Sequence, residues 1–153
     1  MVIIMENCCC GFGHRKFQTD VKTELKTVIE KLISEENITV FLTGGMGDFD
    51  AQFSSAVRSC KIKNRDIMLV LVRPYFSNEL NIHKQYYEYS YDDIIIPTEL
   101  TGCHYKAAIT KRNRWMIEQS QFVLSGVCHD FGGAYEAIEY ARKNKKQIIE
   151  VKK

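Results

Sequence analysis

Residues 38–50, ITVFLTGGMGDFD, join a short β-branched segment to a helical pattern through a glycine-rich turn. Residues 38–43 predict a strand, and Gly44-Gly45-Met46-Gly47 predicts the turn that ends it. Residues 48–61 then predict a helix, because apolar residues recur along one side at helical spacing. A strand, a tight turn and a helix in this order are typical of α/β proteins.

The same alternation extends outward in both directions along the chain. Further strands are predicted at residues 7–10, 67–72, 94–96, 122–127 and 147–151. Further helices are predicted at residues 19–35, 106–120 and 132–143, with a polar, tyrosine-rich connection at 77–93. We therefore predict an α/β fold, a three-layer sandwich with a mostly parallel sheet of about five strands, formed by one domain over residues 1–153.

Composition excludes several classes of protein. The 153 residues are 45% hydrophobic and 26% charged, as in ordinary globular chains. A net charge of +2 is too close to neutral to indicate a nucleic-acid-binding protein by charge alone. No apolar run approaches the roughly 20 residues of a membrane span, and the apolar residues 1–5 are too short for a signal peptide. We expect a cytoplasmic protein without a membrane partner.

Six cysteines bear on the compartment and on metal binding. Cys8, Cys9 and Cys10 are consecutive, and on a strand they would alternate between the two faces as small buried residues. The pairs Cys103-His104 and Cys128-His129 could join His14 around a metal, but their spacing matches no common zinc pattern. We predict no metal and no cofactor, and reduced thiols agree with the cytosol.

Three glycine-containing turns follow predicted strands, at residues 11–15, 44–50 and 132–133. In open α/β sheets, ligands bind outside the carboxyl ends of the strands, where helix N-termini present N–H groups to anions. Any one such turn is commonly structural, but three at one edge favour a phosphate or nucleotide pocket. The predicted ligand-binding residues are Gly13, His14, Arg15, Thr43, Gly44, Gly45, Gly47, Asp50, Arg112, Gly132, Gly133 and Ala134.

Three side chains in the first two turns have predicted roles, and for two of them the alternatives stay open. Arg15 could hold an anion with two hydrogen bonds, or it could be a solvated arginine at a helix start. Asp48 is placed to cap the following helix. Asp50 could serve the helix dipole or accept a hydrogen bond from a ribose hydroxyl.

Basic residues crowd the helix predicted at residues 106–120. Its apolar stripe is predicted to consist of Ile109, Asn113, Met116 and Ile117. Arg112 borders this stripe, so we expect it to need a carboxylate or phosphate partner. We expect Lys111 and Arg114 to be solvated, and Trp115 to be a core anchor.

These motifs resemble the SLOG superfamily. The resemblance rests on Gly13-His14-Arg15, on the turn at residues 43–50, on residues 109–118 (ITKRNRWMIE) and on Phe131-Gly132-Gly133-Ala134. Within SLOG the chain is similar to a small single-domain family found in Firmicutes and their phages. The resemblance implies a Rossmann-like parallel sheet with a nucleotide-derived ligand at the strand edge.

SLOG also includes the LOG-type phosphoribohydrolases, whose motif is partly present. Arg112 and Met116 match its first part, and Glu139 matches its closing glutamate, so the resemblance implies Arg112 and Glu139 as catalytic residues. A carboxylate there could stabilise an oxocarbenium-like state or activate water. Glu139 could equally be an exposed helix carboxylate paired with Lys143.

Other positions depart from that motif. Phe131 stands where the motif has proline, and Tyr135 and Glu136 stand where it has glycine and threonine. These changes remove a small turn and a hydroxyl from the phosphate site. The leading prediction is therefore binding of a nucleotide or nucleotide-derived small molecule, either ADP-ribose-like or a nucleoside phosphate, by a sensor or sequestering protein. The first alternative is a nucleoside 5′-monophosphate phosphoribohydrolase, an N-glycosidase.

Single-stranded DNA binding is the second alternative, because the superfamily is similar in fold to DNA processing protein A. Aromatic residues within 75–91 are interleaved with acids such as Glu79 and Glu88, which suits phosphate tracking poorly, so nucleic acid ranks last. Tyr86, Tyr87 and Tyr91 are expected either beside the pocket, against a partner such as a second copy in a homo-oligomer, or in a self-packed surface loop.

Overall fold

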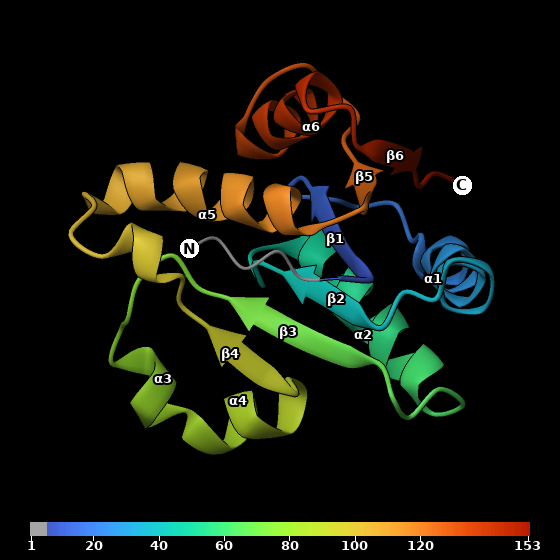
Figure 1. Cartoon of the computed structure of the whole chain (residues 1–153), viewed down its shortest axis with the longest axis horizontal. Helices are drawn as coiled ribbons and strands as arrows, with labels where there is room; N and C mark the ends of the chain where they lie inside the picture. Colours follow the sequence, from blue (N-terminus) through green and yellow to red (C-terminus); the bar gives the residue numbers. More distant parts are fainter. Residues whose placement is uncertain (1–5) are drawn as a thin grey trace.

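A computed structural model describes residues 6–153 and contains a six-stranded sheet in which every pair of neighbours is parallel (Figure 1). The strands are β1 (Cys8–Gly13), β2 (Val40–Thr43), β3 (Met68–Val72), β4 (Asp93–Ile95), β5 (Phe122–Gly126) and β6 (Gln147–Glu150). The predicted parallel sheet is confirmed, with six strands rather than about five. Residues 1–5, the apolar segment predicted to be too short for a signal peptide, lie outside the described residues.

Helices cover both faces of the sheet. They are α1 (Lys22–Glu36), α2 (Asp48–Lys61), α3 (Glu79–Ile82), α4 (Lys84–Ser90), α5 (Tyr105–Gln119) and α6 (Gly133–Lys143), with a 3-10 turn η1 (Thr98–Leu100). Residues of α1 and α2 pack on one face, and residues of α5 and α6 pack on the other. The predicted three-layer, Rossmann-like α/β architecture is therefore confirmed. Among residues 6–153, no helix combines the length and apolar character that crossing a membrane requires.

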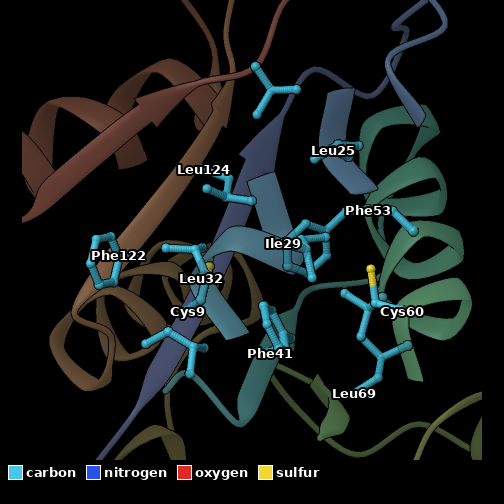
Figure 2. Packing of buried hydrophobic residues seen from close by; sticks show 14 of the residues in the cluster. Cys9, Leu25, Ile29, Leu32, Phe41, Phe53, Cys60, Leu69, Phe122 and Leu124 are labelled. Atoms are coloured by element: carbon cyan, nitrogen blue, oxygen red, sulfur yellow. The ribbon is translucent and has the colours of Figure 1, made fainter. Parts of the chain in front are cut away.

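Alternate strand residues belong to two separate cores, and Figure 2 shows the one under α1 and α2. Cys9 lies with Phe41 in the core under α1 and α2, whereas Cys8 and Cys10 lie in the core under α5 and α6. All three cysteines are 0% exposed, as predicted. Burial raises the pKa of the Cys8 thiol to about 11, so these thiols stay protonated and unreactive at neutral pH.

The order of the strands is β4-β3-β2-β1-β5-β6. Strands β2, β3 and β4 are added in turn on one side of β1, and β5 and β6 are added on its other side, so the strand order reverses between β1 and β5. The carboxyl ends of these two strands meet at Gly13 and Gly126, which are register partners. A Cβ at either glycine would lie 2.2 Å from the Phe49 ring of α2. Glycine is therefore required at both strand ends by core packing, and the sheet opens a crevice at the point where ligands of such folds bind.

The tyrosine-rich segment forms α3 and α4, which lie beyond the edge strand β4 (Figure 1). Tyr87 is 7% exposed and donates a hydrogen bond of 2.6 Å to Glu79. Burial, together with this hydrogen bond, raises the pKa of this tyrosine to about 12. Tyr91 packs against the core under α1 and α2, while Tyr86 is 60% exposed. The segment is thus two short helices folded on their own side chains rather than a plain loop.

Candidate functional site

A cavity of about 460 Å³ opens at the carboxyl ends of the central strands. It is bounded by the end of β1, the loop between β2 and α2, one side of α5 and the start of α6, defined here as Gly132, Gly133 and Ala134. Its lining residues are Phe12, Gly13, His14, Arg15, Lys16, Gly44, Met46, Asp50, Ile109, Arg112, Asn113, His129, Gly132, Gly133 and Ala134. The three glycine-containing turns of the sequence therefore meet around one space.

Most of the predicted ligand-binding residues line this cavity, but Thr43, Gly45 and Gly47 do not. Lining residues that were not among the predicted ligand-binding residues are Phe12, Lys16, Met46, Ile109, Asn113 and His129. Lys16 and Met46 adjoin predicted positions and could have been included by proximity alone. The sequence carries no sign that His129, in the loop after β5, stacks on His14 at the end of the neighbouring strand β1.

Arg112 is the most buried cation of the site, with 3% of its surface exposed. Its Nη1 donates to the backbone carbonyls of Val72 at 2.9 Å and Gly44 at 3.4 Å, and its Nη2 contacts Met46 Sδ at 3.2 Å. Burial lowers the pKa of Arg112 to about 10, which leaves the guanidinium charged at neutral pH. The two carbonyls fix its plane, and the weak thioether acceptor is the contact that a stronger ligand could replace.

The buried side of α5 differs from the predicted stripe. Ala108, Arg112 and Met116 are buried at a spacing of four residues, so Arg112 lies within the buried face instead of beside it. Ile109 and Asn113 are only half-buried. A Cβ at Gly44 would lie 3.0 Å from the Arg112 guanidinium carbon, so the glycine makes room for this cation.

Asp50 is the carboxylate of the cavity and is 8% exposed. Its Oδ2 accepts a hydrogen bond of 2.8 Å from the Met46 backbone N–H. Burial raises the pKa of this carboxyl to about 6, and that hydrogen bond, Arg112 and Arg15 offset only part of the effect. Asp50 therefore lines the cavity as a carboxylate, which is where one of its two sequence interpretations needs it.

The loop between β2 and α2 uses its own N–H groups. Thr43 Oγ1 accepts from Gly45 N at 3.1 Å, and Asp50 accepts from Met46 N. The prediction that Asp48 caps α2 is wrong, because Gly47 holds the cap position with φ 99° and Asp48 Oδ2 accepts from Phe17 N at 3.0 Å. These contacts leave the loop less open to an anion than its glycines indicated.

The start of α6 has a different character. Gly132 adopts φ 95°, and a Cβ at Gly132 or Gly133 would meet no atom within 4 Å. The first N–H groups of a helix have no partner within the helix, and the helix dipole adds partial positive charge there. Arg15 and Lys16 are exposed and line the same cavity. This wall of the cavity therefore favours an anion.

His14 connects β1 to the loop before α6. Its Nε2 accepts hydrogen bonds from the backbone N–H groups of Cys128 at 2.9 Å and His129 at 3.4 Å. An acceptor at Nε2 requires an unprotonated nitrogen there. Burial, together with nearby His129, lowers the pKa of His14, which favours that neutral form. His14 therefore holds this loop in place through Nε2, and its neutral ring supplies no positive charge to a ligand.

Glu139 lies outside this cavity. It lines a second cavity of about 450 Å³ with Cys128, His129 and Asp130, and its carboxylate contacts Arg142 Nε at 3.5 Å. The expected helix pairing thus involves Arg142 rather than Lys143. Arg112 and Glu139, the pair that the hydrolase motif implied, line different cavities.

The residues considered for a metal also separate. His104 accepts from Lys106 N at the start of α5, and Cys103 Sγ contacts Lys111 Nζ at 3.3 Å. Cys128 and His129 instead adjoin His14, whose Nε2 is occupied by backbone N–H groups.

Comparisons with known proteins bear on the fold. No protein-family model matches the chain, and no curated protein matches it. DNA processing protein A (DprA) from Streptococcus pneumoniae superimposes with a TM-score of 0.64 at 15% identity, over 93% of this chain and 49% of that one. DNA processing protein A from Helicobacter pylori, which binds single-stranded DNA, gives 0.64 at 18% identity, over 94% of this chain and 64% of that one.

A third structure is the molybdenum cofactor binding protein from the phototrophic bacterium Rippkaea orientalis. It superimposes with a TM-score of 0.55 at 22% identity, over 94% of this chain and 73% of that chain. This chain spans about half the length of the pneumococcal protein and just under two thirds of the H. pylori protein. The chain therefore shares the Rossmann-like fold of these proteins, the fold that its resemblance to SLOG proteins implied.

Proposed function

We propose that the protein binds a small, anionic, nucleotide-derived molecule in the cavity at the ends of β1 and β5, as a sensor or sequestering protein. One observation carries this proposal: the start of α6, the exposed cations Arg15 and Lys16, and the buried Arg112 line the same space. Free helix N–H groups and guanidinium groups are the donors that phosphate prefers. The phosphate would contact the start of α6, and Asp50 would accept from a sugar hydroxyl.

Two proteins of similar fold support a ligand that carries phosphate. The R. orientalis protein binds the molybdenum cofactor, and the H. pylori protein binds single-stranded DNA. Both ligand classes carry phosphate, so the fold accommodates phosphate-bearing molecules. The six free thiols suit a reducing compartment, and we place the protein in the cytoplasm.

Hydrolysis is the less supported candidate. The carboxylate that the hydrolase motif uses for base release is Glu139, and Glu139 lines the neighbouring cavity instead of the proposed phosphate site. Incubation with AMP followed by chromatography for adenine tests this point. Adenine release that is lost in Glu139→Gln would replace the binding proposal by the hydrolase.

Binding itself is tested with paired charge variants. Small molecules released from the purified protein identify the ligand by mass spectrometry, and calorimetry with inorganic phosphate, ribose 5-phosphate and AMP measures affinity. Arg15→Ala combined with Lys16→Ala should weaken binding by about tenfold or more, since charge-assisted hydrogen bonds are each worth roughly 1.5–3 kcal/mol. Lys22→Ala combined with Lys26→Ala removes the same charge from exposed positions on α1 and should change little. Equal losses in both double variants would indicate a diffuse electrostatic attraction and refute the site.

A further inference from the structure

Three aromatic rings form a column beside the start of α6. The His14 and His129 rings lie 3.4 Å apart between centroids and 15° from parallel, and the His129 and Phe131 rings lie 3.9 Å apart and 20° from parallel. His14 is 7% exposed, whereas Phe131 is 66% exposed. This ring column therefore runs from the buried wall of the cavity to a ring that solvent reaches.

Backbone contacts hold the ring column in place before any ligand arrives. The two hydrogen bonds that His14 Nε2 accepts tie the loop carrying His129 to the end of β1. Gly132 then turns the chain into α6 directly after Phe131. An aromatic side chain has only two torsions, so stacking on a ring that is already positioned costs little conformational entropy.

The outer face of Phe131 favours another planar ring. Offset, nearly parallel aromatic pairs are favourable, and bases stack readily on exposed aromatic side chains. Phe131 is adjacent in sequence to Gly132 and Gly133, where the proposed function places a phosphate. In a nucleotide, a single sugar separates phosphate from base, so one molecule could reach both groups.

We propose that the ligand of the cavity carries a nucleobase, and that this base stacks on the outer face of Phe131 while its phosphate contacts the start of α6. The inference rests on the proposed function and goes beyond it by naming the aromatic part of the ligand and the residue that recognises it. The same chemistry could come from a free nucleotide or from one base of a single strand, and the experiment separates these sources.

The test compares ligands with and without a base on matched variants. Calorimetry measures AMP and ribose 5-phosphate binding to the full chain, to Phe131→Ala and Phe131→Trp, and to the control Tyr89→Ala, whose ring on α4 is 93% exposed. Loss of one stacking contact should weaken AMP binding by about fivefold to 100-fold in Phe131→Ala, with ribose 5-phosphate changed by less than about twofold. Phe131→Trp should retain or improve AMP binding, and Tyr89→Ala should match the unaltered chain.

Several outcomes would overturn the inference. AMP binding that is no tighter than ribose 5-phosphate binding, or an equal loss of both in Phe131→Ala, would show that no base stacks there while leaving the phosphate site intact. If AMP, ribose 5-phosphate and a short single-stranded oligothymidylate all fail to bind, the proposed function itself is refuted. If the oligothymidylate binds and loses the same factor in Phe131→Ala while AMP does not bind, the stack stands and the base belongs to nucleic acid.

Discussion

Replacing Asp50 with asparagine tests whether the cavity keeps a carboxylate at the expense of stability. Asp50 is 8% exposed, and burial raises the pKa of its carboxyl from 3.8 to about 6. The unfolded chain therefore releases this proton at lower pH than the folded chain does. A shift of about two pH units corresponds to about 3 kcal/mol of folding free energy, lost once both states are ionised.

The sign of this linkage is opposite to that of a salt-bridged carboxylate. As the pH rises from about 3.8 to about 6, the free energy of unfolding falls, because the folded state still holds a proton that the unfolded state has lost. The Asp50→Asn variant has no such proton and keeps an oxygen for the Met46 N–H. We expect it to be more stable than the unaltered chain by up to about 3 kcal/mol at about pH 7.5, with the gain vanishing near about pH 4.

Urea denaturation across this pH range, followed by the fluorescence of the half-buried Trp115, measures the difference. Asp48→Asn is the matched control, because it removes an exposed carboxylate from the same helical turn and should change stability by less than about 1 kcal/mol. A difference for Asp50→Asn that stays constant with pH, or a loss of stability at neutral pH, would refute the reasoning. Arg112 and Arg15 would then stabilise the charge by more than its burial costs.

Three further substitutions test packing and hydrogen bonding in urea unfolding. Arg112→Met should lower the free energy of unfolding by about 2–4 kcal/mol, because two carbonyls lose their buried donor. The control Arg114→Met, at an exposed position, should change it by less than about 1 kcal/mol. Similar values for the two variants would contradict the buried role of Arg112. Gly126→Ala should cost about 1–3 kcal/mol through its clash with the Phe49 ring. Phe49→Ala, which removes the clashing ring atoms, should cost less in that variant than in the unaltered chain; strictly additive effects would exclude the contact. Since burial lowers the pKa of His14, the free energy of unfolding of the unaltered chain should fall as the pH falls below about 6.5. His14→Gln should lack the part of this fall that comes from His14. Parallel pH profiles for the two proteins would contradict the buried, neutral state of His14.

Much of the fold could be predicted because hydrophobic spacing alone specifies it. The cysteine triplet was placed on alternate faces of a strand from periodicity, and both faces are buried as expected. Both ends of α2 agree with the prediction. The six strands were each found within a few residues of their predicted positions, and the edge strand β4, with three residues, gave the weakest pattern.

The details of the site could not be predicted because they depend on contacts between distant parts of the chain. Arg112 bonds to carbonyls that are 40 and 68 residues away in sequence, so its place inside the buried face was not visible in the helix pattern. Asp48 lost its expected capping role to Gly47 because the loop after β1 packs against that turn and its Phe17 N–H takes the carboxylate. Glu139 matched a motif, but its position on α6 directs it to the neighbouring cavity.

The pairing of β1 with β5 has a consequence for synthesis on the ribosome. The backbone N–H of Cys8 bonds to Gln121, 113 residues later in the chain, and the start of α6 comes later still. Strands β1 to β4 can associate while the chain is emerging, but the side of β1 that pairs with β5 stays unpaired until β5 has also emerged. Contacts between residues so far apart in the sequence form slowly. The nascent protein thus exposes an unpaired side of an inner strand until β5 has emerged, and the proposed site is complete only once the start of α6 has followed.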